Sequence, residues 1–472
     1  MEKRILVGGK WMTASETFEV RSPYSGELVA TVYSADTDIS SQSIGHASKA
    51  AEIMRGLARF EIASGLRKIA FGIAARRDEF ATTITLESAK PIIYARAEVD
   101  RAVATFSWAA SEAERFVGEI VPIDTQPAGR GKTARTERRP KGVIYGMTPF
   151  NFPLNLVAHK VAPALASGNA IIIKPSPRTP LTALLLGEVF LESGLPGAAL
   201  QIVPLDIRHL QTVFDDERIA MVSFTGSADV GWEIKKRIGK KSLALELGGN
   251  APVIVDRSAN LETALPKLLT GAFAYSGQVC ISVQRLYLHE ELFDRWTRTL
   301  AEEAGKLEVG DPMAESTRLS VMIDEAAATR AESWINEAVS NGARLVCGGT
   351  RNGSFLPPTI LTNTDPEMRV VAEEAFAPLL VIEKFDNVAN AVASANDTRY
   401  GLQAGVFSYD QIALDSIIGD LDFGTVIVND VPSFRIDNMP YGGVKDSGFG
   451  REGVRYAMEE MSELKLVISS QI

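Results

Sequence analysis

The sequence predicts an α/β protein built around a parallel, Rossmann-like sheet. From Gly142 onward, short apolar runs alternate with longer segments of helical periodicity. Residues 143–145, 170–173 and 220–224 read as strands, and residues 154–167 read as a helix between the first two. Strands that alternate with helices form βαβ units and therefore a parallel sheet. At 472 residues the chain is also too long for one hydrophobic core, so two or three domains are expected.

The segments on either side of this alternation complete the expected fold in chain order. Residues 5–33 contain short strand patterns separated by turn signals. Residues 39–117 have helical spacing with a single break at residues 90–91, which predicts an extra layer of helices. Residues 119–140 are polar and turn-prone, and taken alone they would form a solvated loop. Near the end, residues 464–468 read as a strand, which needs a partner strand.

Composition narrows the class of protein. The net charge of −10 and the pI near 5.2 disfavour nucleic acid and anionic membrane as partners. No stretch reaches the roughly 18 apolar residues of a membrane span, and the first residues lack a secretory signal. Two cysteines far apart give no disulfide framework and fit a reducing compartment. We therefore expect a cytoplasmic protein, and no metal site is expected.

One of the two cysteines, Cys280, lies in the turn-like segment Tyr275-Ser276-Gly277-Gln278-Val279-Cys280. A free thiol has a reference pKa of about 8.5 and is mostly protonated at neutral pH, so it becomes a nucleophile only where its surroundings favour the thiolate. An isolated cysteine is more often a small buried hydrophobe. Cys280 is a candidate for covalent catalysis only if partner residues occur elsewhere in the chain.

Such partners occur in seven blocks along the chain. They are residues 148–153, 174–176, 224–227, 243–252, 272–282, 373–378 and 440–448. In this order the blocks resemble the signature segments of the NAD(P)-dependent aldehyde dehydrogenase superfamily, and the resemblance covers nearly the whole chain. Within this superfamily, the sequence most resembles the branch of lactaldehyde and non-phosphorylating glyceraldehyde-3-phosphate dehydrogenases.

The resemblance implies the aldehyde dehydrogenase fold, in which a Rossmann-like cofactor domain and an α/β catalytic domain are joined by a small β oligomerisation flap. In this sequence the dinucleotide-binding domain would comprise residues 1–118 and 141–247, and the catalytic domain residues 248–445. Residues 119–140 and 462–472 would form the oligomerisation hairpin and the C-terminal strand. In the family this strand pairs across a subunit interface, so a homodimer or homotetramer is implied.

The resemblance also implies the catalytic roles. Cys280 would attack the carbonyl carbon of an aldehyde, and the Asn151 side-chain amide would stabilise the oxyanion together with the Cys280 backbone N–H. Glu246 would activate the water that hydrolyses the resulting thioester. Read without the family, Asn151 between two prolines could be a turn residue. Glu246 could be a structural carboxylate, since an unpaired carboxylate in an apolar strand is costly.

Cofactor binding is indicated by a strand-to-helix junction. Thr225-Gly226-Ser227 ends a strand and opens a helix, which points backbone N–H groups at a phosphate, although Ser227 could be only an N-cap. By resemblance, Lys174 would contact the adenosine ribose and Glu374 the nicotinamide ribose. The other implied cofactor residues are Phe376, Thr148, Phe150, Leu247 and Gly248.

The choice between NAD and NADP is open. Three positions after Lys174, where NAD-preferring relatives often carry a glutamate, this sequence has Pro177 followed by Arg178. The missing carboxylate removes a repulsion against a 2′-phosphate, and Arg178 could attract it. Asp206, in the loop 205–209, would act in the opposite direction, and Arg178 could simply face solvent. We expect NAD or NADP as the cofactor, with NADP use indicated by Pro177 and Arg178.

The substrate side gives weaker signals. His159 lies where many relatives place a tunnel-lining tryptophan, and an imidazole suits a small polar or anionic aldehyde, although it could be a helix histidine satisfied by its surroundings. Phe434 would form a pocket wall, with Ser433, Arg435 and Arg285 as possible anion contacts. Val279 and, on a loose alignment, Ser107 stand where phosphate-binding relatives carry arginine, which disfavours a phosphorylated substrate. Small hydroxyaldehydes or semialdehydes are expected.

Two other functions remain open at this point. In a CoA-acylating aldehyde dehydrogenase, CoA takes the acyl group in place of water, and Glu246 argues against this because that branch generally lacks the base. A thiol esterase could use the same cysteine, and a structural protein could keep the fold without the chemistry. The presence of Cys280, Glu246, Asn151, Lys174 and Glu374 together disfavours both.

Overall fold

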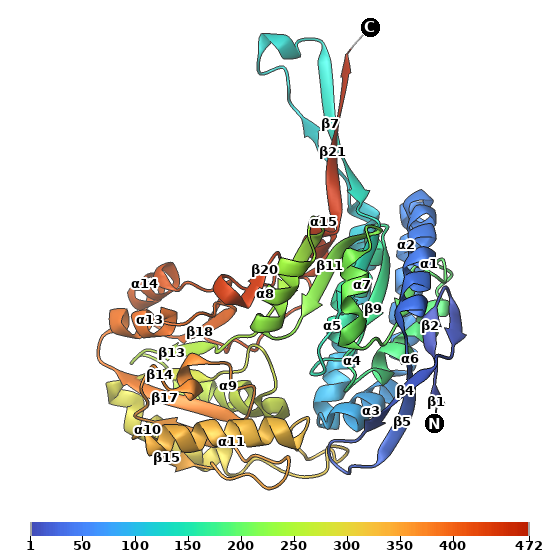
Figure 1. The fold of residues 1–472 in the computed structure, drawn as a ribbon. Coiled ribbons are helices and arrows are strands. Elements are labelled where there is room, and N and C mark those ends of the chain that lie inside the picture. Colours follow the sequence, from blue (N-terminus) through green and yellow to red (C-terminus); the bar gives the residue numbers. More distant parts are fainter. Residues whose placement is uncertain (1, 471–472) are drawn as a thin grey trace.

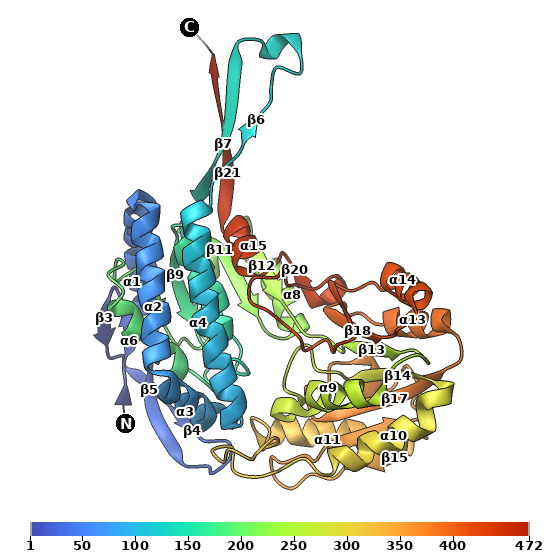
Figure 2. The same ribbon diagram turned by 180° about the vertical axis from the view of Figure 1, so that it is seen from behind.

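The computed structural model describes residues 2–470, which form two α/β lobes and a long arm (Figures 1 and 2). The lobe in blue and green is built mainly from the first half of the chain, and the lobe in yellow and orange from the second. The arm leaves the first lobe, and the C-terminal strand runs along it. The α/β class predicted from the alternation of strands and helices is confirmed.

The first lobe contains an eight-stranded sheet whose central strands are parallel. At one edge β20 runs antiparallel to β12. At the other, β2 runs antiparallel to β10, and the edge strand β3 runs antiparallel to β2. In spatial order the strands are β20 (Gly448–Phe449), β12 (Ser242–Glu246), β11 (Ile219–Thr225), β8 (Val143–Met147), β9 (Ala170–Lys174), β10 (Leu200–Ile202), β2 (Ile5–Val7) and β3 (Lys10–Met12).

Helices cover this sheet in two layers on one side. Helices α5 and α6 lie directly against the strands, and α2, α3 and α4 pack on them, as Figure 2 shows for α2 and α4. The predicted extra helical layer is therefore confirmed. The helices of this lobe are α1 (Thr37–Gly56), α2 (Arg59–Ala75), α3 (Arg77–Ser88), α4 (Ile92–Arg115), α5 (Asn155–Ala166), α6 (Leu181–Leu191), α7 (Leu210–Asp215), α8 (Ala228–Arg237) and α15 (Val454–Glu460), with the 3₁₀ turn η2 (Ile207–His209) before α7.

The prediction of a single break between residues 39 and 117 is wrong, because the chain also turns after Gly56 and at Arg76. Residues 57–58 are extended, and the Glu61 carboxylate accepts a hydrogen bond of 2.8 Å from the Ala58 N–H, which starts α2. No glycine–proline signal marks this boundary. Gly56 at the end of α1 and the capping Glu61 are the local signs of this boundary.

The second lobe contains a seven-stranded sheet in which only the edge strand β15 is antiparallel to its neighbour. In spatial order its strands are β15 (Arg344–Cys347), β16 (Thr359–Thr362), β17 (Leu379–Phe385), β14 (Arg285–His289), β13 (Pro252–Val255), β18 (Gln403–Phe407) and β19 (Thr425–Val428). Its helices are α9 (Leu261–Phe273), α10 (Glu290–Ala304), α11 (Glu325–Ser340), α12 (Arg369–Ala372), α13 (Val388–Asn396) and α14 (Gln411–Asp420), with the 3₁₀ turns η3 (Ala274–Gly277) and η4 (Lys445–Ser447).

Two small sheets complete the fold. One, at the base of the first lobe, has the order β1 (Glu2–Lys3), β5 (Leu28–Ser34) and β4 (Glu16–Arg21). The other forms the arm and has the order β21 (Ser462–Ser470), β7 (Lys132–Pro140) and β6 (Ile120–Val121), with the 3₁₀ turn η1 (Pro127–Gly129) at its tip. No helix of the described residues combines the length and the apolar character needed to cross a membrane.

The arm contains the expected hairpin and supplies the partner strand that the terminal strand needs. The terminal strand β21 finds its partner inside its own chain, where it pairs antiparallel with β7 from Ser462↔Pro140 to Ser470↔Lys132. Residues 119–140 therefore form a hairpin arm and not a solvated loop. Residues 471 and 472 of the expected C-terminal segment lie outside the described residues.

Candidate active site

The candidate site lies where strands of the first lobe end beside the second lobe. The parallel strands β8, β9, β11 and β12 all end at the same edge of their sheet. In open α/β sheets, ligands bind in the crevice at this edge. These strand ends are followed by or contain Asn151, Lys174, Thr225 and Glu246, so residues far apart in sequence are brought to one place.

Cys280 is delivered from the second lobe by a tight, strained turn. Tyr275, Ser276 and Gly277 have successive φ values of 51°, 54° and 66°, which place all three in the left-handed region. A Cβ at Gly277 would lie 2.0 Å from the Ala377 carbonyl oxygen, so only glycine fits there. Ser276 Oγ donates to the Ser320 carbonyl at 2.7 Å. Consecutive left-handed residues persist only where the surroundings hold them, and here they present the cysteine.

The structure brings Cys280, Asn151 and Glu246 together in one cavity of about 320 Å³. Its other lining residues come from both lobes and include most of the expected cofactor residues. They are Pro149, Phe150, Leu156, Thr225, Gly226, Ser227, Leu247, Gly248, Arg330, Glu374 and Phe376. The convergence expected from the sequence is therefore present in the fold.

The amide of Asn151 is fixed against the nucleophile loop. Its Nδ2 donates to the Gln278 carbonyl at 2.9 Å, and the residue is 3% exposed. An amide nitrogen carries two N–H groups, so one remains free for an oxygen that binds beside Cys280. Asn151 Oδ1 is buried without a hydrogen-bond partner among the described residues. The amide is held in place and still has a donor to offer.

Cys280 contacts a residue that the sequence analysis did not assign. The Tyr441 hydroxyl lies 3.2 Å from Cys280 Sγ. Desolvation raises the pKa of the Cys280 thiol to about 11, and the hydrogen bond with Tyr441 opposes this rise. Glu374 and Glu246 also raise the pKa of the thiol, whereas Arg435 lowers it. The thiol is therefore protonated at neutral pH until further positive charge or a better donor reaches it.

Glu246 is a buried carboxylate with spare hydrogen-bonding capacity. It is 4% exposed, and its Oε2 has no partner within the described part of the chain. Burial, together with the neighbouring Glu452 carboxylate, raises the pKa of Glu246 well above its ordinary value. A carboxylate with a raised pKa is a stronger proton acceptor, which suits a general base.

Glu452 is held ionised by two cations behind Glu246. Lys160 Nζ lies 3.1 Å from Glu452 Oε1, and Arg435 Nη2 lies 3.3 Å from Glu452 Oε2. These neighbours, with His159, lower the pKa of Glu452 despite its burial. The wall behind Glu246 is therefore a cluster of buried opposite charges.

The opposite wall of the cavity is mostly backbone and apolar surface. Thr225 Oγ1 is buried without a partner among the described residues, at the amino end of α8. A Cβ at Gly248 would lie 2.2 Å from Glu374 Oε2. The rings of Phe150 and Phe376 meet edge to face with centroids 5.8 Å apart. An open hydroxyl, a helix amino end and close glycine backbone fit the sugar and phosphate groups of a dinucleotide.

Glu374 is the one carboxylate on this wall. It accepts a hydrogen bond of 3.1 Å from the Gly249 N–H, and burial raises its pKa to about 7. Arg330 lines the same wall, and its charge partly opposes this rise. Neither Arg330 nor Leu156 was singled out from the sequence, because a helix arginine or leucine carries no local mark of a site.

Three expected cofactor residues lie outside this cavity. Lys174 is 8% exposed at the end of β9, and the Thr148 N–H donates to its carbonyl at 3.2 Å. Burial lowers the pKa of Lys174, while Asp206 opposes the fall. Arg178 points toward the second lobe, where it pairs with Asp324 at 2.7 Å. Its guanidinium is therefore already engaged.

The expected substrate residues need correction. The Arg285 guanidinium is buried and donates to the carbonyls of Asn250, Ser394 and Ala395, so it cannot contact an anion in the cavity. Its position on β14, two residues before Tyr287, turns it toward α13. His159 is likewise closed in, at 1% exposed.

His159 belongs to a buried polar cluster between α4, α5 and the loop that precedes Tyr441. Its Nε2 lies 2.8 Å from Asp437 Oδ1, which Arg101 also contacts at 2.7 Å. The histidine is therefore a buried structural residue held through Nε2, while its Nδ1 has no hydrogen-bond partner among the described residues. Phe434 is 44% exposed and Ser433 is partly exposed, and neither lines the cavity around Cys280.

The position of an arginine on α4 also differs from the expected one. The loose alignment pointed to Ser107, whose Oγ donates to the Val103 carbonyl at 2.8 Å. The structure instead places Arg101, on the same helix, in the polar cluster with Asp437 and His159. The sequence signal that could have indicated Arg101 is the pair of charged residues Arg435 and Asp437. A buried charge needs a partner of opposite sign, so each of them predicts another charged residue close by.

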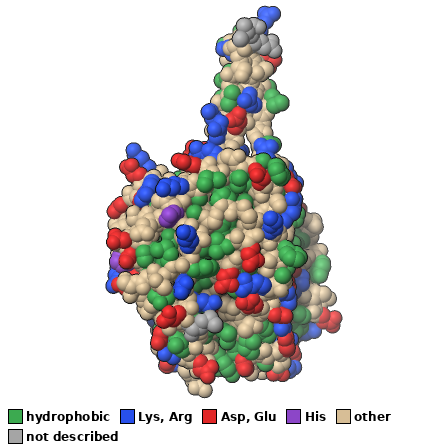
Figure 3. Space-filling model, turned by 90° about the vertical axis from the view of Figure 1, so that its right-hand side faces the viewer, with side chains coloured by type: hydrophobic (Ala, Val, Ile, Leu, Met, Phe, Trp, Pro, Cys, Tyr) green, Lys and Arg blue, Asp and Glu red, His purple; other side chains and the backbone are tan. Residues whose placement is uncertain are grey.

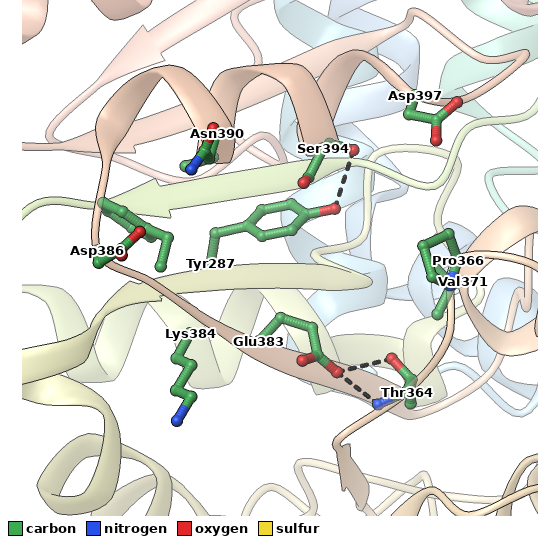
Figure 4. A pocket seen from close by; sticks show the side chains of 12 residues that line it. Tyr287, Thr364, Pro366, Val371, Glu383, Lys384, Asp386, Asn390, Ser394 and Asp397 are labelled. Carbon is green, nitrogen blue, oxygen red and sulfur yellow. Dashed lines mark hydrogen bonds between the residues drawn. The ribbon is translucent and has the colours of Figure 1, made fainter.

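A second cavity lies between β17 and α13 in the second lobe (Figure 4). Two of its polar side chains are already bonded: Glu383 Oε1 accepts from both the N–H and the hydroxyl of Thr364 at 2.7 Å, and the Tyr287 hydroxyl donates to the Ser394 carbonyl at 3.1 Å. No cysteine lines it. The cavity that holds Cys280 is therefore the candidate active site.

Comparison with known proteins agrees with this geometry. Residues 11–467 match the aldehyde dehydrogenase family. A 3-sulfolactaldehyde dehydrogenase from Priestia aryabhattai is 39% identical over 465 residues, which cover 98% of this chain and 97% of that protein.

Two solved structures have the same fold over nearly the whole chain. Aldehyde dehydrogenase 21 from Physcomitrella patens, in complex with the reaction product succinate, has a TM-score of 0.97 at 39% identity and covers 99% of this chain and 98% of its own. Glyceraldehyde-3-phosphate dehydrogenase GapN from Methanocaldococcus jannaschii, complexed with NADP, has a TM-score of 0.93 at 36% identity, covering 97% and 100%.

The chain belongs to the aldehyde dehydrogenase family. It is an oxidoreductase with the aldehyde dehydrogenase fold, and the resemblance seen in the seven sequence blocks is confirmed, including its relation to the branch that contains GapN.

Proposed function

We propose that this enzyme oxidises a small polar aldehyde to its carboxylate with NAD or NADP, through a covalent thioester on Cys280. The observation that carries the proposal is the shared cavity in which Cys280, Asn151 and Glu246 face the strand-to-helix turn Thr225-Gly226-Ser227. A nucleophile, an amide donor, a base and a cradle for a phosphate are the parts that this reaction needs.

In the first step the Cys280 thiolate attacks the carbonyl carbon of the aldehyde. The free N–H of Asn151 and the Cys280 backbone N–H stabilise the negative charge that develops on oxygen. The hydrogen bond from Asn151 to the Gln278 carbonyl keeps the amide oriented throughout. Donors fixed in this way cost no reorganisation when the charge appears.

A bound nicotinamide nucleotide would supply the acceptor for the hydride that leaves the carbon atom bonded to Cys280. Thr225, Ser227 and the amino end of α8 would bind its phosphates, Glu374 its nicotinamide ribose and Lys174 its adenosine ribose. Phe376 and Phe150 would pack beside the nicotinamide, with Leu247 and Gly248 below it. Thr148 supports this edge through its hydrogen bond to the Lys174 carbonyl.

Glu246 then takes a proton from water, which attacks the acyl carbon and releases the acid and the Cys280 thiol. Its raised pKa and its unpartnered oxygen suit this role. The same base argues against a CoA-acylating enzyme, and the cofactor wall argues against a plain thiol esterase. Release of free acid without CoA separates these alternatives.

The substrate class rests on the relatives. The Priestia relative is a 3-sulfolactaldehyde dehydrogenase, and the Physcomitrella structure holds succinate. Both compounds are small and carry an acidic group. We propose a hydroxyaldehyde or a semialdehyde, with Phe434 and Ser433 at the outer end of the substrate path.

The parts of the chain divide these tasks. Residues 1–118 and 141–247 form the proposed dinucleotide-binding domain, residues 248–445 the catalytic domain, and the arm the oligomerisation element. On β21, Leu464, Leu466 and Ile468 are each more than half exposed. Because alternate residues of a strand share one face, these three side chains form one exposed apolar face. Figure 3 shows apolar side chains on the arm beside its charged ones. An exposed apolar strand of this kind fits a homodimer or homotetramer.

One experiment tests the core of the proposal. Cys280→Ser is compared with the wild-type enzyme on glycolaldehyde, lactaldehyde, succinic semialdehyde and glyceraldehyde, each with NAD and with NADP. We expect a loss of turnover of about a thousandfold or more, because serine is not activated by this site. The matched variant Cys347→Ser changes the other free thiol, which lies on the edge strand β15, and should keep wild-type turnover. Full turnover of Cys280→Ser would show that the mechanism is not covalent through this residue.

A further inference from the structure

The loop Pro440–Gly443 touches both the nucleophile and the base. Tyr441 places its hydroxyl 3.2 Å from Cys280 Sγ, and a Cβ at Gly442 would lie 3.0 Å from Glu246 Oε1. The Tyr441 and Glu452 backbones exchange two hydrogen bonds, of 3.0 and 2.7 Å, which fix the loop. Tyr441 itself is 2% exposed, so its ring cannot swing away from the thiol without repacking.

A buried arginine lies against the other face of the same tyrosine. The Arg435 guanidinium carbon is 3.6 Å from the centroid of the Tyr441 ring, which is a close cation–π stack. The Arg435 side chain is 5% exposed, and Glu452 holds it at 3.3 Å. Arg435 Nε has no hydrogen-bond partner within the described residues. A cation on the face of a phenol withdraws electron density from the ring and makes the O–H a stronger donor.

We propose that Tyr441 donates a hydrogen bond to the Cys280 thiolate and that Arg435 is the positioning residue that strengthens this donor. Tyr441 touches the reacting sulfur, so it is a catalytic residue. Arg435 acts through the tyrosine ring. The proposal rests on the proposed role of Cys280 as the nucleophile and adds a group that stabilises its charged form.

The charges around Cys280 explain why such a donor is useful. Glu374 and Glu246 face the thiol from the two walls of the cavity, and both disfavour a negative sulfur. Arg435 and the Tyr441 hydrogen bond favour it. Burial raises the pKa of Tyr441 well above its usual value, so the phenol keeps its proton and remains a donor at neutral pH. When the thiolate attacks the aldehyde, the hydrogen bond to sulfur is released.

The test is the pH profile of thiol alkylation. Iodoacetamide labelling of Cys280 is followed by mass spectrometry in the Cys347→Ser background, without cofactor. Tyr441→Phe removes one hydroxyl and keeps the ring for Arg435. We expect its labelling midpoint to move to higher pH by about one unit, because a hydrogen bond to a charged group is lost. Arg435→Gln keeps the hydroxyl and should give a smaller shift in the same direction.

The matched control is Tyr145→Phe, which removes a buried phenol hydroxyl on β8 that has no partner among the described residues. Its profile should coincide with that of the wild-type enzyme. A Tyr441→Phe profile that coincides with wild type would overturn the proposal, and an Arg435→Gln profile that does so would remove the arginine from it. Turnover by Cys280→Ser would refute the proposed function instead, while the labelling profiles would still decide the Tyr441 contact.

Discussion

The two walls of the active-site cavity are built on different physical principles. The wall formed by Thr225, Gly226, Ser227 and Gly248 is backbone and small side chains, shaped by glycines that leave no room for a Cβ. The wall behind Glu246 is a cluster of buried charges. Both walls enclose the Cys280 thiol, but the first is suited to binding a nucleotide and the second to proton transfer.

The difference separates binding from chemistry. A nucleotide is recognised by shape and by fixed N–H donors, and these do not titrate. Proton transfer needs a carboxylate whose pKa is poised, which burial and neighbouring charge provide. We therefore expect changes in the first wall to act mainly on cofactor affinity, and changes in the second to act mainly on turnover and its pH dependence.

The largest effect should come from Glu246→Gln. The amide keeps the shape of the side chain and cannot accept a proton, so steady-state turnover should fall by about 10²–10⁴-fold. Thioester formation does not need this base, and a burst of reduced nucleotide of about one equivalent should therefore remain. Rapid-mixing fluorescence of the reduced nucleotide measures both quantities.

The pH dependence follows from the same residue. Because the pKa of Glu246 is raised well above its ordinary value, its base form is gained as pH rises, and wild-type turnover should increase with pH above the range in which an ordinary glutamate titrates. The matched control is Glu383→Gln, which changes a carboxylate with a raised pKa outside the cavity. An unchanged steady state in Glu246→Gln would mean that another group activates the water.

Glu374→Gln should have a smaller effect, and it should act mainly on the KM for the nucleotide. The pKa of Glu374 is raised to about 7, so the group is protonated below that pH and becomes a carboxylate above it. The KM for the nucleotide should fall in the wild type as pH rises through this value. In the variant we expect a KM about tenfold higher and nearly independent of pH, with kcat changed less.

The neighbouring Glu373→Gln is the matched control. Glu373 pairs with Arg399 at 3.2 Å and does not line the cavity. Its KM should follow the wild-type pH dependence. If Glu374→Gln lowered kcat and left KM unchanged, the division between a binding wall and a chemical wall would fail at this residue.

The sequence predicted the first wall better than the second. Thr225 and Glu246 end the strands β11 and β12, Asn151 follows β8, and parallel strands end at a common edge. Cys280 was marked by a turn motif. Each of these signals is weak alone, and the roles of Cys280, Asn151 and Glu246 were predicted from the resemblance of the seven ordered blocks to the family.

The second wall depends on packing between distant segments. Nothing local in Lys160 on α5 or Glu452 before α15 shows that their side chains meet at 3.1 Å. Arg285 illustrates the opposite error, since the alternation of a strand allowed either face and the structure turns the side chain toward α13. The direction of a buried polar side chain is set by its partners, and these are known only once the fold is known.

The smallest effect concerns Arg178, which lies outside both walls and tests whether shape alone selects the nucleotide. Its side chain is 60% exposed and pairs with Asp324, and an exposed ion pair of this kind contributes only up to about 1 kcal/mol. If Arg178 attracts a 2′-phosphate, Arg178→Ala should reduce kcat/KM for NADP by about threefold to fivefold and leave that for NAD unchanged.

Asp324→Asn should act in the opposite direction, because it releases the guanidinium that Asp324 now holds at 2.7 Å. We expect a small rise in kcat/KM for NADP, of about twofold to threefold, by the same electrostatic argument. Arg21→Ala removes another exposed arginine that lines the same surface cavity as Arg178 and serves as the matched control for general charge. If the ratio of kcat/KM for NADP to that for NAD is the same in all three variants and the wild type, these charges do not select the nucleotide. The choice would then depend on the backbone wall and on the absence of a carboxylate at Pro177.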